Sequence, residues 1–264
     1  MLVIAHRGAS RVAPENTVEA FRLADEMGSD GVELDARLAP DGRLVVAHDP
    51  LPDDVSAVSE LPDLATILEA CGERMLINVE IKNDQPWDAP SPRPSRSGAD
   101  SSQRAIWSGS VPESGTEGPQ IALPTVDLAV VAPTIEVLHA SGIEPARFLI
   151  SSFSWPTIEA CRQLDPRLAT AALCVDAEPD QLDRIARRGH LALHPFEPQL
   201  IAERVAQCHD RGLLVTTWTC NDPERIAELA AMGVDGVCTD VPDVARDALG
   251  RTAVAVRPRW ARAG

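Results

Sequence analysis

Ionisable side chains gather at several points in the first third of the chain, each beside a short apolar run. The segment IAHRG places His6 and Arg7 directly after apolar residues. In GVELD, Glu33 and Asp35 are two residues apart, and the alternation of a strand puts both on one face. The segment VVAHDP adds His48 after another short extended run. Groups of these types in one site could hold a cation and transfer protons.

A further segment, NVEIKN, places Glu80 and Lys82 on one face of a predicted strand. If Glu33, Asp35 and Glu80 were buried together without a cation, their mutual repulsion would keep some of them protonated. An all-oxygen ligand set suits Mg²⁺ or Ca²⁺, with Mn²⁺ as a further candidate, better than zinc. The sequence therefore predicts a site for one divalent cation.

Such a cation would neutralise and orient a phosphodiester, whose free oxygens Arg7 and Lys82 could contact. His6 and His48 suit general acid and base work, because imidazole ordinarily titrates near neutral pH. Taken singly, an E-x-D pair or a lone histidine is more often structural. The combination, in this order along the chain, is what favours a catalytic site.

The scaffold follows from the alternation of eight short apolar runs with stretches of helical period, the pattern of βα units around a parallel sheet. The predicted strands are Leu2–His6, Gly31–Asp35, Met75–Lys82, Phe148–Ser152, Leu168–Cys174, Leu191–His194, Leu213–Trp218 and Gly236–Thr239. The predicted helices are Thr17–Met27, Leu61–Cys71, Thr125–Ala140, Trp155–Leu164, Asp180–Arg187, Pro198–Arg211, Pro223–Met232 and Val241–Leu249. The 264 residues fit one TIM-like (β/α)8 barrel, an α/β single domain over residues 1–250, with its site at the carboxyl ends of the strands.

Two segments depart from this rhythm. Residues 85–120 are rich in Pro, Ser and Gly, which predicts a flexible insertion after the third predicted strand. It could cover the site, but a tolerated surface insertion is the simpler interpretation, since lengthening a loop costs little. Residues 251–264 are predicted to form a basic tail.

The composition of the chain limits the classes of molecule that it is expected to bind. A formal net charge of −16 disfavours nucleic acid, and a small anionic molecule is the expected substrate. There is no apolar run of about 18 residues and no signal-peptide pattern, which predicts a cytoplasmic protein without stable membrane insertion. The six cysteines have neither zinc spacing nor a C-x-x-C pair and are interpreted as reduced thiols. The oligomeric state stays open.

Longer motifs carry a family resemblance. The segments HRGASRVAPENTVEAF, DGVELDARLAPDGRLVVAHDP, LPDLATILEA and VEIK resemble the glycerophosphodiester phosphodiesterase family, and LLVTTWTCNDPERIAELAAMGVDGVCTDVPD is similar to that family's ending. The resemblance covers nearly the whole chain outside residues 85–120. It implies a phosphoric diester hydrolase that uses a divalent cation to convert glycerophosphodiesters to an alcohol and glycerol 3-phosphate.

The resemblance also implies roles for eight residues. These are the catalytic pair His6 and His48, the metal ligands Glu33, Asp35 and Glu80, the phosphate contacts Arg7 and Lys82, and, near the substrate's glycerol, Trp218. For Trp218, packing over the barrel end is an equal alternative. The sequence leaves open whether a glycerol hydroxyl or water attacks phosphorus, and which histidine is the acid.

Several residues beside these motifs have a structural interpretation or are further candidates. Pro14 and Asn16 are interpreted as a helix entry, with Asn16 as its cap, and Glu15 as a brace for the HRG loop. Phe153 and His194 follow predicted strands at the barrel mouth and are candidate substrate contacts. After HDP the segment LPDDVSAVSELPDL departs from the family's usual Arg-Thr-Thr-Gly-like stretch, so the preferred alcohol headgroup stays open.

Other functions fit parts of the sequence. A phospholipase D-like or lysophospholipid phosphodiesterase could use the same barrel, but an aromatic content of 3% and the absence of a membrane-binding amphipathic helix disfavour it. A non-catalytic barrel that binds a polyol phosphate predicts the loss of a histidine or carboxylate, yet all are present. A metal-independent isomerase would gain nothing from three clustered carboxylates.

Overall fold

Eight parallel strands close into a barrel in the computed structural model, which describes residues 1–52, 54–83 and 128–251. In order around the barrel they are β1 (Leu2–His6), β2 (Gly31–Leu38), β4 (Leu76–Ile81), β5 (Phe148–Ser152), β6 (Ala169–Cys174), β7 (Ala192–Pro195), β8 (Leu214–Thr217) and β9 (Gly236–Thr239). Because β1 pairs with both β2 and β9, the sheet has no open edge there. The predicted TIM-like (β/α)8 barrel is confirmed.

A short additional strand, β3 (Leu44–Val46), pairs antiparallel with the far end of β2. Its register joins Ala36 to Val46 and Leu38 to Leu44. The hairpin therefore returns the chain toward the barrel mouth just before His48. The sequence predicted only an extended run here.

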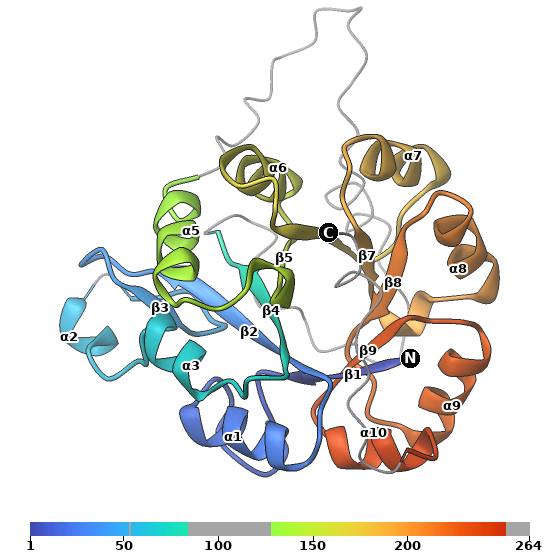
Figure 1. Cartoon of the computed structure of the whole chain (residues 1–264), viewed down its shortest axis with the longest axis horizontal. Coiled ribbons are helices and arrows are strands. Elements are labelled where there is room, and N and C mark those ends of the chain that lie inside the picture. Colours follow the sequence, from blue (N-terminus) through green and yellow to red (C-terminus); the bar gives the residue numbers. More distant parts are fainter. Residues whose placement is uncertain (53, 84–127, 252–264) are drawn as a thin grey trace, which may run out of the picture.

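Helices surround the barrel (Figure 1). They are α1 (Val18–Glu26), α2 (Val55–Val58), α3 (Leu64–Ala70), α5 (Val131–Ala140), α6 (Trp155–Leu164), α7 (Pro179–Arg187), α8 (Ala202–His209), α9 (Pro223–Ala231) and α10 (Pro242–Ala248), with 3-10 turns at Pro145–Arg147 and Glu197–Gln199. Capping residues set where helices begin. At the start of α9, for example, the Asp222 side chain accepts the N–H of Glu224, and Pro223 occupies the first turn.

The predicted elements overlap the observed ones, with shifts at their ends. The helix predicted over Pro198–Arg211 begins later, as α8, because residues up to Gln199 form a 3-10 turn first. The short helix α2 was not predicted. The predicted insertion at 85–120 and residues 252–264 of the predicted tail lie outside the described residues.

Apolar side chains fill the spaces on both sides of the strands. Between sheet and helices, Phe21 of α1 and Phe148 of β5 are fully buried. Inside the barrel, Leu2, Ile4 and Leu76 form one apolar cluster, with Cys238. Alternation along each strand thus leaves the carboxyl ends of the strands free to carry polar groups into the barrel mouth.

The phrases GSDGVELD and GVDGVCTD have equivalent places in the fold. Asp30 Oδ2 accepts the N–H of Val3 at 2.8 Å, and Asp235 Oδ2 accepts the N–H of Val215 at 2.9 Å. The backbone N–H of Asp30 also donates to the carbonyl of Val3, and that of Asp235 to the carbonyl of Val215, at 2.9 Å in both cases. Each phrase therefore ties the start of one strand to the strand beside it.

No helix within residues 1–52, 54–83 and 128–251 is long and apolar enough to cross a membrane. The six cysteines are buried free thiols.

The turn after β1 packs tightly against α1, and a substitution at Gly8 tests this close approach. Gly8 has φ +82°, and an added Cβ would lie 2.6 Å from the carbonyl carbon of Ala20. We predict that Gly8→Ala lowers the free energy of unfolding in urea by about 3 kcal/mol, from backbone strain plus overpacking.

Gly42 is the matched control, because it has φ +86° but nothing within 4 Å of an added Cβ. Gly42→Ala should lower the free energy of unfolding by about 1 kcal/mol, the strain contribution alone. Equal losses for the two variants would contradict the close approach of the β1 turn to α1.

Candidate active site

A cavity of about 950 Å³ opens at the carboxyl ends of the barrel strands. Seven of the predicted site residues line it: His6, Arg7, Glu33, His48, Glu80, Lys82 and Trp218. The eighth, Asp35, is 1% exposed and contacts Arg7 and Lys82, which do line the cavity. The structure therefore brings all eight to one place.

The carboxylates of Glu33, Asp35 and Glu80 each have an oxygen within 4.8 Å of the others. Strand register explains this, because Asp35 of β2 lies opposite Glu80 of β4 in the parallel pair. All three residues are buried. Glu33 Oε1 has no hydrogen-bond partner within the described residues, so the cluster retains an acceptor suited to a hard cation.

Two cations face these three carboxylates. Lys82 Nζ donates to Glu80 and lies 3.2 Å from Asp35 Oδ1, and Arg7 Nε lies 3.1 Å from Asp35 Oδ2. Burial alone would raise the pKa of Asp35, but the charges of Lys82 and Arg7 outweigh it and lower that pKa below its usual range. Burial and the charges of Asp35 and Glu80 raise the pKa of Glu33 well above its usual value. Three carboxylates thus face two positively charged side chains, and full ionisation of the carboxylates would leave one negative charge without a counter-charge.

Arg7 is held in a left-handed conformation, with φ 53°, that aims its backbone at the cluster. Its N–H donates to Glu33 Oε2 at 3.1 Å, and its Nη1 donates to both carboxylate oxygens of Glu15 at 3.0 Å. The predicted bracing role of Glu15 is confirmed. A positive φ outside glycine is costly, and its occurrence at a site residue is typical of functional loops.

Asn16 supports the cluster and does not cap the following helix, so that prediction was wrong. Asn16 has φ 59°, and its Nδ2 donates to Asp35 Oδ2 at 2.9 Å. The cap of α1 is Thr17, whose Oγ1 accepts the N–H of Ala20 at 3.2 Å. The Asn16 side chain is turned inward, toward Asp35.

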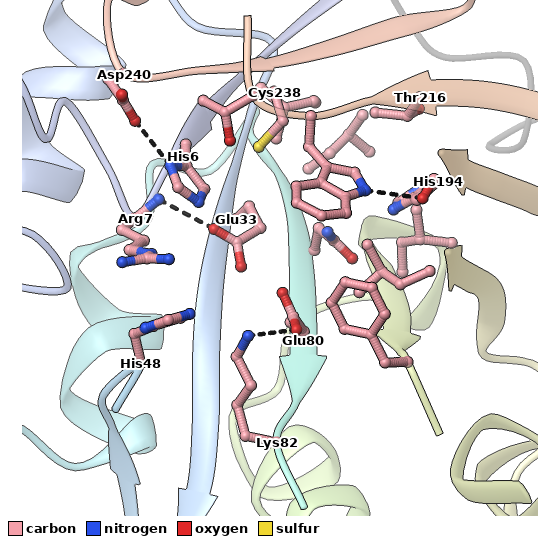
Figure 2. A pocket seen from close by; sticks show the side chains of 18 of the residues that line it. His6, Arg7, Glu33, His48, Glu80, Lys82, His194, Thr216, Cys238 and Asp240 are labelled. Carbon is pink, nitrogen blue, oxygen red and sulfur yellow. Dashed lines mark hydrogen bonds and ion pairs between the residues drawn. The ribbon is translucent and has the colours of Figure 1, made fainter. Parts of the chain in front are cut away.

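His6 is paired with Asp240, a residue that the sequence analysis did not select. Asp240 follows β9, and its Oδ1 lies 2.7 Å from His6 Nδ1 (Figure 2). A carboxylate at this nitrogen favours the tautomer with hydrogen on Nδ1. The sequence signal was present, since an acid directly after a barrel strand is in the same position as the other site residues.

Further groups hold Asp240 in place. Asn221 Nδ2 donates to Asp240 Oδ2 at 2.7 Å, and Ser10 Oγ donates to Asp240 Oδ1 at 3.1 Å. Burial opposes the charged form, but hydrogen bonds from His6 and from these two side chains outweigh it and lower the pKa of Asp240 to about 2. Asp240 is therefore ionised throughout the neutral range.

His48 has a different support. Its Nδ1 lies 2.9 Å from Oδ1 of Asp49, whose side chain is 83% exposed. Its backbone carbonyl accepts two hydrogen bonds from Arg37, at 3.0 Å from Nε and 2.7 Å from Nη2. Burial and the charges of Lys82 and Arg7 lower the pKa of His48. The backbone of His48 is fixed more firmly than its ring.

The opposite side of the cavity is aromatic. The ring centroid of Trp218 lies 5.5 Å from that of Phe153 and 5.1 Å from that of Phe196. Trp218 Nε1 donates to the carbonyl of His194 at 2.8 Å. Trp218, Phe153 and His194 all line the cavity, so both candidate contacts, Phe153 and His194, do reach it.

The chain is similar to proteins of a known family. The profile of the Glycerophosphoryl diester phosphodiesterase family matches residues 6–69 and 118–244. A Caldanaerobacter subterraneus protein named glycerophosphodiester phosphodiesterase is 29% identical over 92% of this chain and 95% of its own length. The Bacillus subtilis protein YqiK is 30% identical, over 92% of this chain and 96% of its own.

Solved structures share the fold. A phosphodiesterase from Oleispira antarctica, determined in complex with its product sn-glycerol-3-phosphate, has a TM-score of 0.72 at 21% identity, over 95% of this chain and 97% of its own. A Silicibacter pomeroyi protein described as a glycerophosphoryl diester phosphodiesterase has a TM-score of 0.69 at 24% identity, over 94% of this chain and 93% of its own.

The bond between Asp240 and His6 predicts a spectroscopic signature. We expect the ¹⁵N shifts of neutral His6 to show hydrogen on Nδ1 in the wild type, and Asp240→Asn to mix the two tautomers, because an amide can donate as well as accept. Asp49→Asn is the matched control at His48 and should change its shifts less, since Asp49 is exposed. Unchanged His6 shifts in Asp240→Asn would contradict the assignment.

Proposed function

The chain belongs to the glycerophosphoryl diester phosphodiesterase family, and on that premise we propose that it hydrolyses glycerophosphodiesters to an alcohol and glycerol 3-phosphate using one divalent cation and two histidines. The observation that carries this proposal is the cluster of Glu33, Asp35 and Glu80 at the cavity that His6 also lines. A phosphodiester is the substrate that a carboxylate-bound cation with two flanking basic side chains suits best.

Glu33, Asp35 and Glu80 would hold the cation, and their oxygen donors favour Mg²⁺ or Ca²⁺, with Mn²⁺ as an alternative. When bound, the cation supplies charge neutralisation at phosphate and activation of an attacking hydroxyl or water. The unpartnered Glu33 Oε1 and the raised pKa of Glu33 both support the binding of a cation beside Glu33.

Arg7 and Lys82 would bind the free phosphate oxygens and stabilise the charge that grows on them during transfer. Both are already oriented: Arg7 by Glu15 and Lys82 by Glu80. Their pKa values lie above the usual range because neighbouring carboxylates outweigh the effect of burial, so both stay charged.

His6 is suited to accept the proton from the attacking hydroxyl. With hydrogen held on Nδ1 by Asp240, its Nε2 is the free basic atom, and the ionised Asp240 stabilises the imidazolium that forms. His48, whose pKa is lowered in the substrate-free site, would then have to carry its second proton to protonate the departing alcohol. The same pair serves a cyclic phosphate route or direct attack by water.

The charge of the chain supports a small-molecule substrate and no nucleic acid. The buried free thiols support a reducing compartment, and we propose the cytoplasm. We retain the prediction of one domain over residues 1–250, with an insertion at about 85–120.

Turnover tests the proposal directly. Release of glycerol 3-phosphate from a panel of glycerophosphodiesters should require Mg²⁺ or Ca²⁺ and stop with EDTA. We expect Glu33→Gln and His6→Ala to lower kcat by about 10³-fold, and Asp240→Asn by about 10²-fold with little change in KM.

Glu228→Gln, which alters an exposed carboxylate on α9, is the control and should keep full activity. Turnover that persists in EDTA would contradict the cation. Firm metal binding without turnover of any diester would favour the non-catalytic barrel.

Metal binding should also release a proton. Because burial and the charges of Asp35 and Glu80 raise the pKa of Glu33 in the metal-free cluster, a bound cation would lower that pKa and favour release of a proton. Calorimetric titration with Mg²⁺ in two buffers of different ionisation enthalpy should give different apparent enthalpies, and Glu33→Gln should abolish the difference. Identical enthalpies for the wild type would contradict coupling between metal binding and proton release.

A further inference from the structure

Arg37 is a buried cation on the strand that also carries two of the predicted metal ligands. Leu34 and Ala36 of β2 belong to the apolar core between the sheet and the helices. The alternation of the strand therefore puts Arg37 on the same face as Glu33 and Asp35, further along toward the hairpin. Arg37 is 2% exposed. Burying a charged group is costly unless it is hydrogen-bonded, and two hydrogen bonds of Arg37 lead to His48.

Both of these hydrogen bonds reach the same main-chain atom. The Nε of Arg37 lies 3.0 Å, and its Nη2 lies 2.7 Å, from the carbonyl oxygen of His48. These two nitrogens share one edge of the planar guanidinium group. The side chain of Arg37 therefore fixes the direction of the His48 carbonyl as well as its distance.

Within the described residues, few other contacts hold the main chain of His48. The pairing of β3 with β2 ends at Val46, and the N–H of Ala47 donates to the carbonyl of Asp35 at 2.9 Å. Hydrogen bonds between main-chain groups of the described residues then stop until Asp54. Most of the residues just after His48 are exposed. His48 thus begins an exposed segment, and Arg37 ties it to the barrel.

The imidazole ring of His48 has weaker support than its main chain. The ring pairs with Asp49, whose side chain is 83% exposed, and ion pairs at exposed positions contribute little. Figure 2 shows the ring pointing into the cavity, toward the side that carries Glu33 and Lys82. Because a side chain reaches only as far as its backbone allows, a fixed His48 carbonyl limits where the ring can lie.

We propose that Arg37 is the positioning residue of His48, holding its main chain where the imidazole can meet the departing alcohol. This inference rests on the proposed function. Arg37 does not line the cavity, so it would act through His48 and not on the substrate. Strand β2 then carries two of the proposed cation ligands and also sets the place of the proposed acid.

The choice of leaving group separates this role from a purely structural one, such as closing the hairpin of β2 and β3. A general acid matters for an alkyl alcohol, whereas 4-nitrophenolate departs without a proton. Arg37→Met should lower kcat about tenfold to hundredfold for glycerophosphodiesters of alkyl alcohols, and less than about threefold for the 4-nitrophenyl diester. A ratio is measured because partial unfolding lowers both rates equally.

Two further variants link the effect to His48. His48→Ala removes the acid itself and should show the same dependence on leaving group more strongly. Arg37→Lys should recover part of the loss, because an ammonium group can donate to the His48 carbonyl but cannot present two donors along one edge. Since it keeps the charge, Arg37→Lys also serves if Arg37→Met folds poorly.

Arg147→Met is the matched control. Arg147 also holds main-chain carbonyls, through Nε to Met75 at 2.9 Å and through Nη2 to Gly72 at 2.5 Å. These bonds lie before the start of β4, and none of the three residues lines the cavity. Arg147→Met should lower stability and leave the ratio between the two leaving groups unchanged.

The NMR order parameter of the His48 backbone N–H gives a readout that needs no turnover. We expect it to fall from about 0.85 in the wild type to below about 0.6 in Arg37→Met. It should stay at the wild-type value in Arg147→Met.

If the wild type cleaves no diester but the order parameter of His48 falls in Arg37→Met alone, the positioning of His48 stands and the proposed hydrolase function fails. If turnover is normal and Arg37→Met slows both classes of diester equally, or neither, the positioning role is overturned. An order parameter that Arg37→Met leaves unchanged would also overturn it.

Discussion

The whole barrel mouth depends on keeping three carboxylates together out of water. Glu33, Asp35 and Glu80 repel one another at the separations observed, and the low polarisability of their surroundings makes this repulsion stronger than in solvent. Lys82 and Arg7 offset part of it, and Asn16 adds a hydrogen bond to Asp35. A chain with a formal net charge of −16 thus places two basic side chains, Arg7 and Lys82, against its buried carboxylates.

Much of this arrangement could be predicted from local sequence, because strand geometry is local. Alternation places Glu33 and Asp35 on one face of their strand, and Glu80 and Lys82 on one face of theirs. The parallel register, which sets Asp35 opposite Glu80, then follows from packing neighbouring βα units. Eight strands and their helices were recognisable for the same reason, since each unit carries its own apolar period.

The remaining features depend on contacts between distant segments. Asp240 lies 234 residues from His6, and no spacing rule links them. Asn16 is of a residue type that often caps helices, and only the position of Asp35 in space explains why its side chain turns inward. His194 and Asn78 come from strands that are not neighbours in the barrel, so their shared cavity appears only once the sheet has closed.

The bond between His6 and Asp240 joins the first strand of the barrel to the last. Contacts of such high sequence separation are formed late in folding, because the entropy of closing a long loop opposes them. Partly folded barrels that lack β9 would contain the carboxylates of β2 and β4 but an unoriented His6. In the proposed mechanism, catalytic competence would therefore arrive together with the final strand, and an incompletely folded chain would be catalytically silent even where Glu33, Asp35 and Glu80 were already assembled.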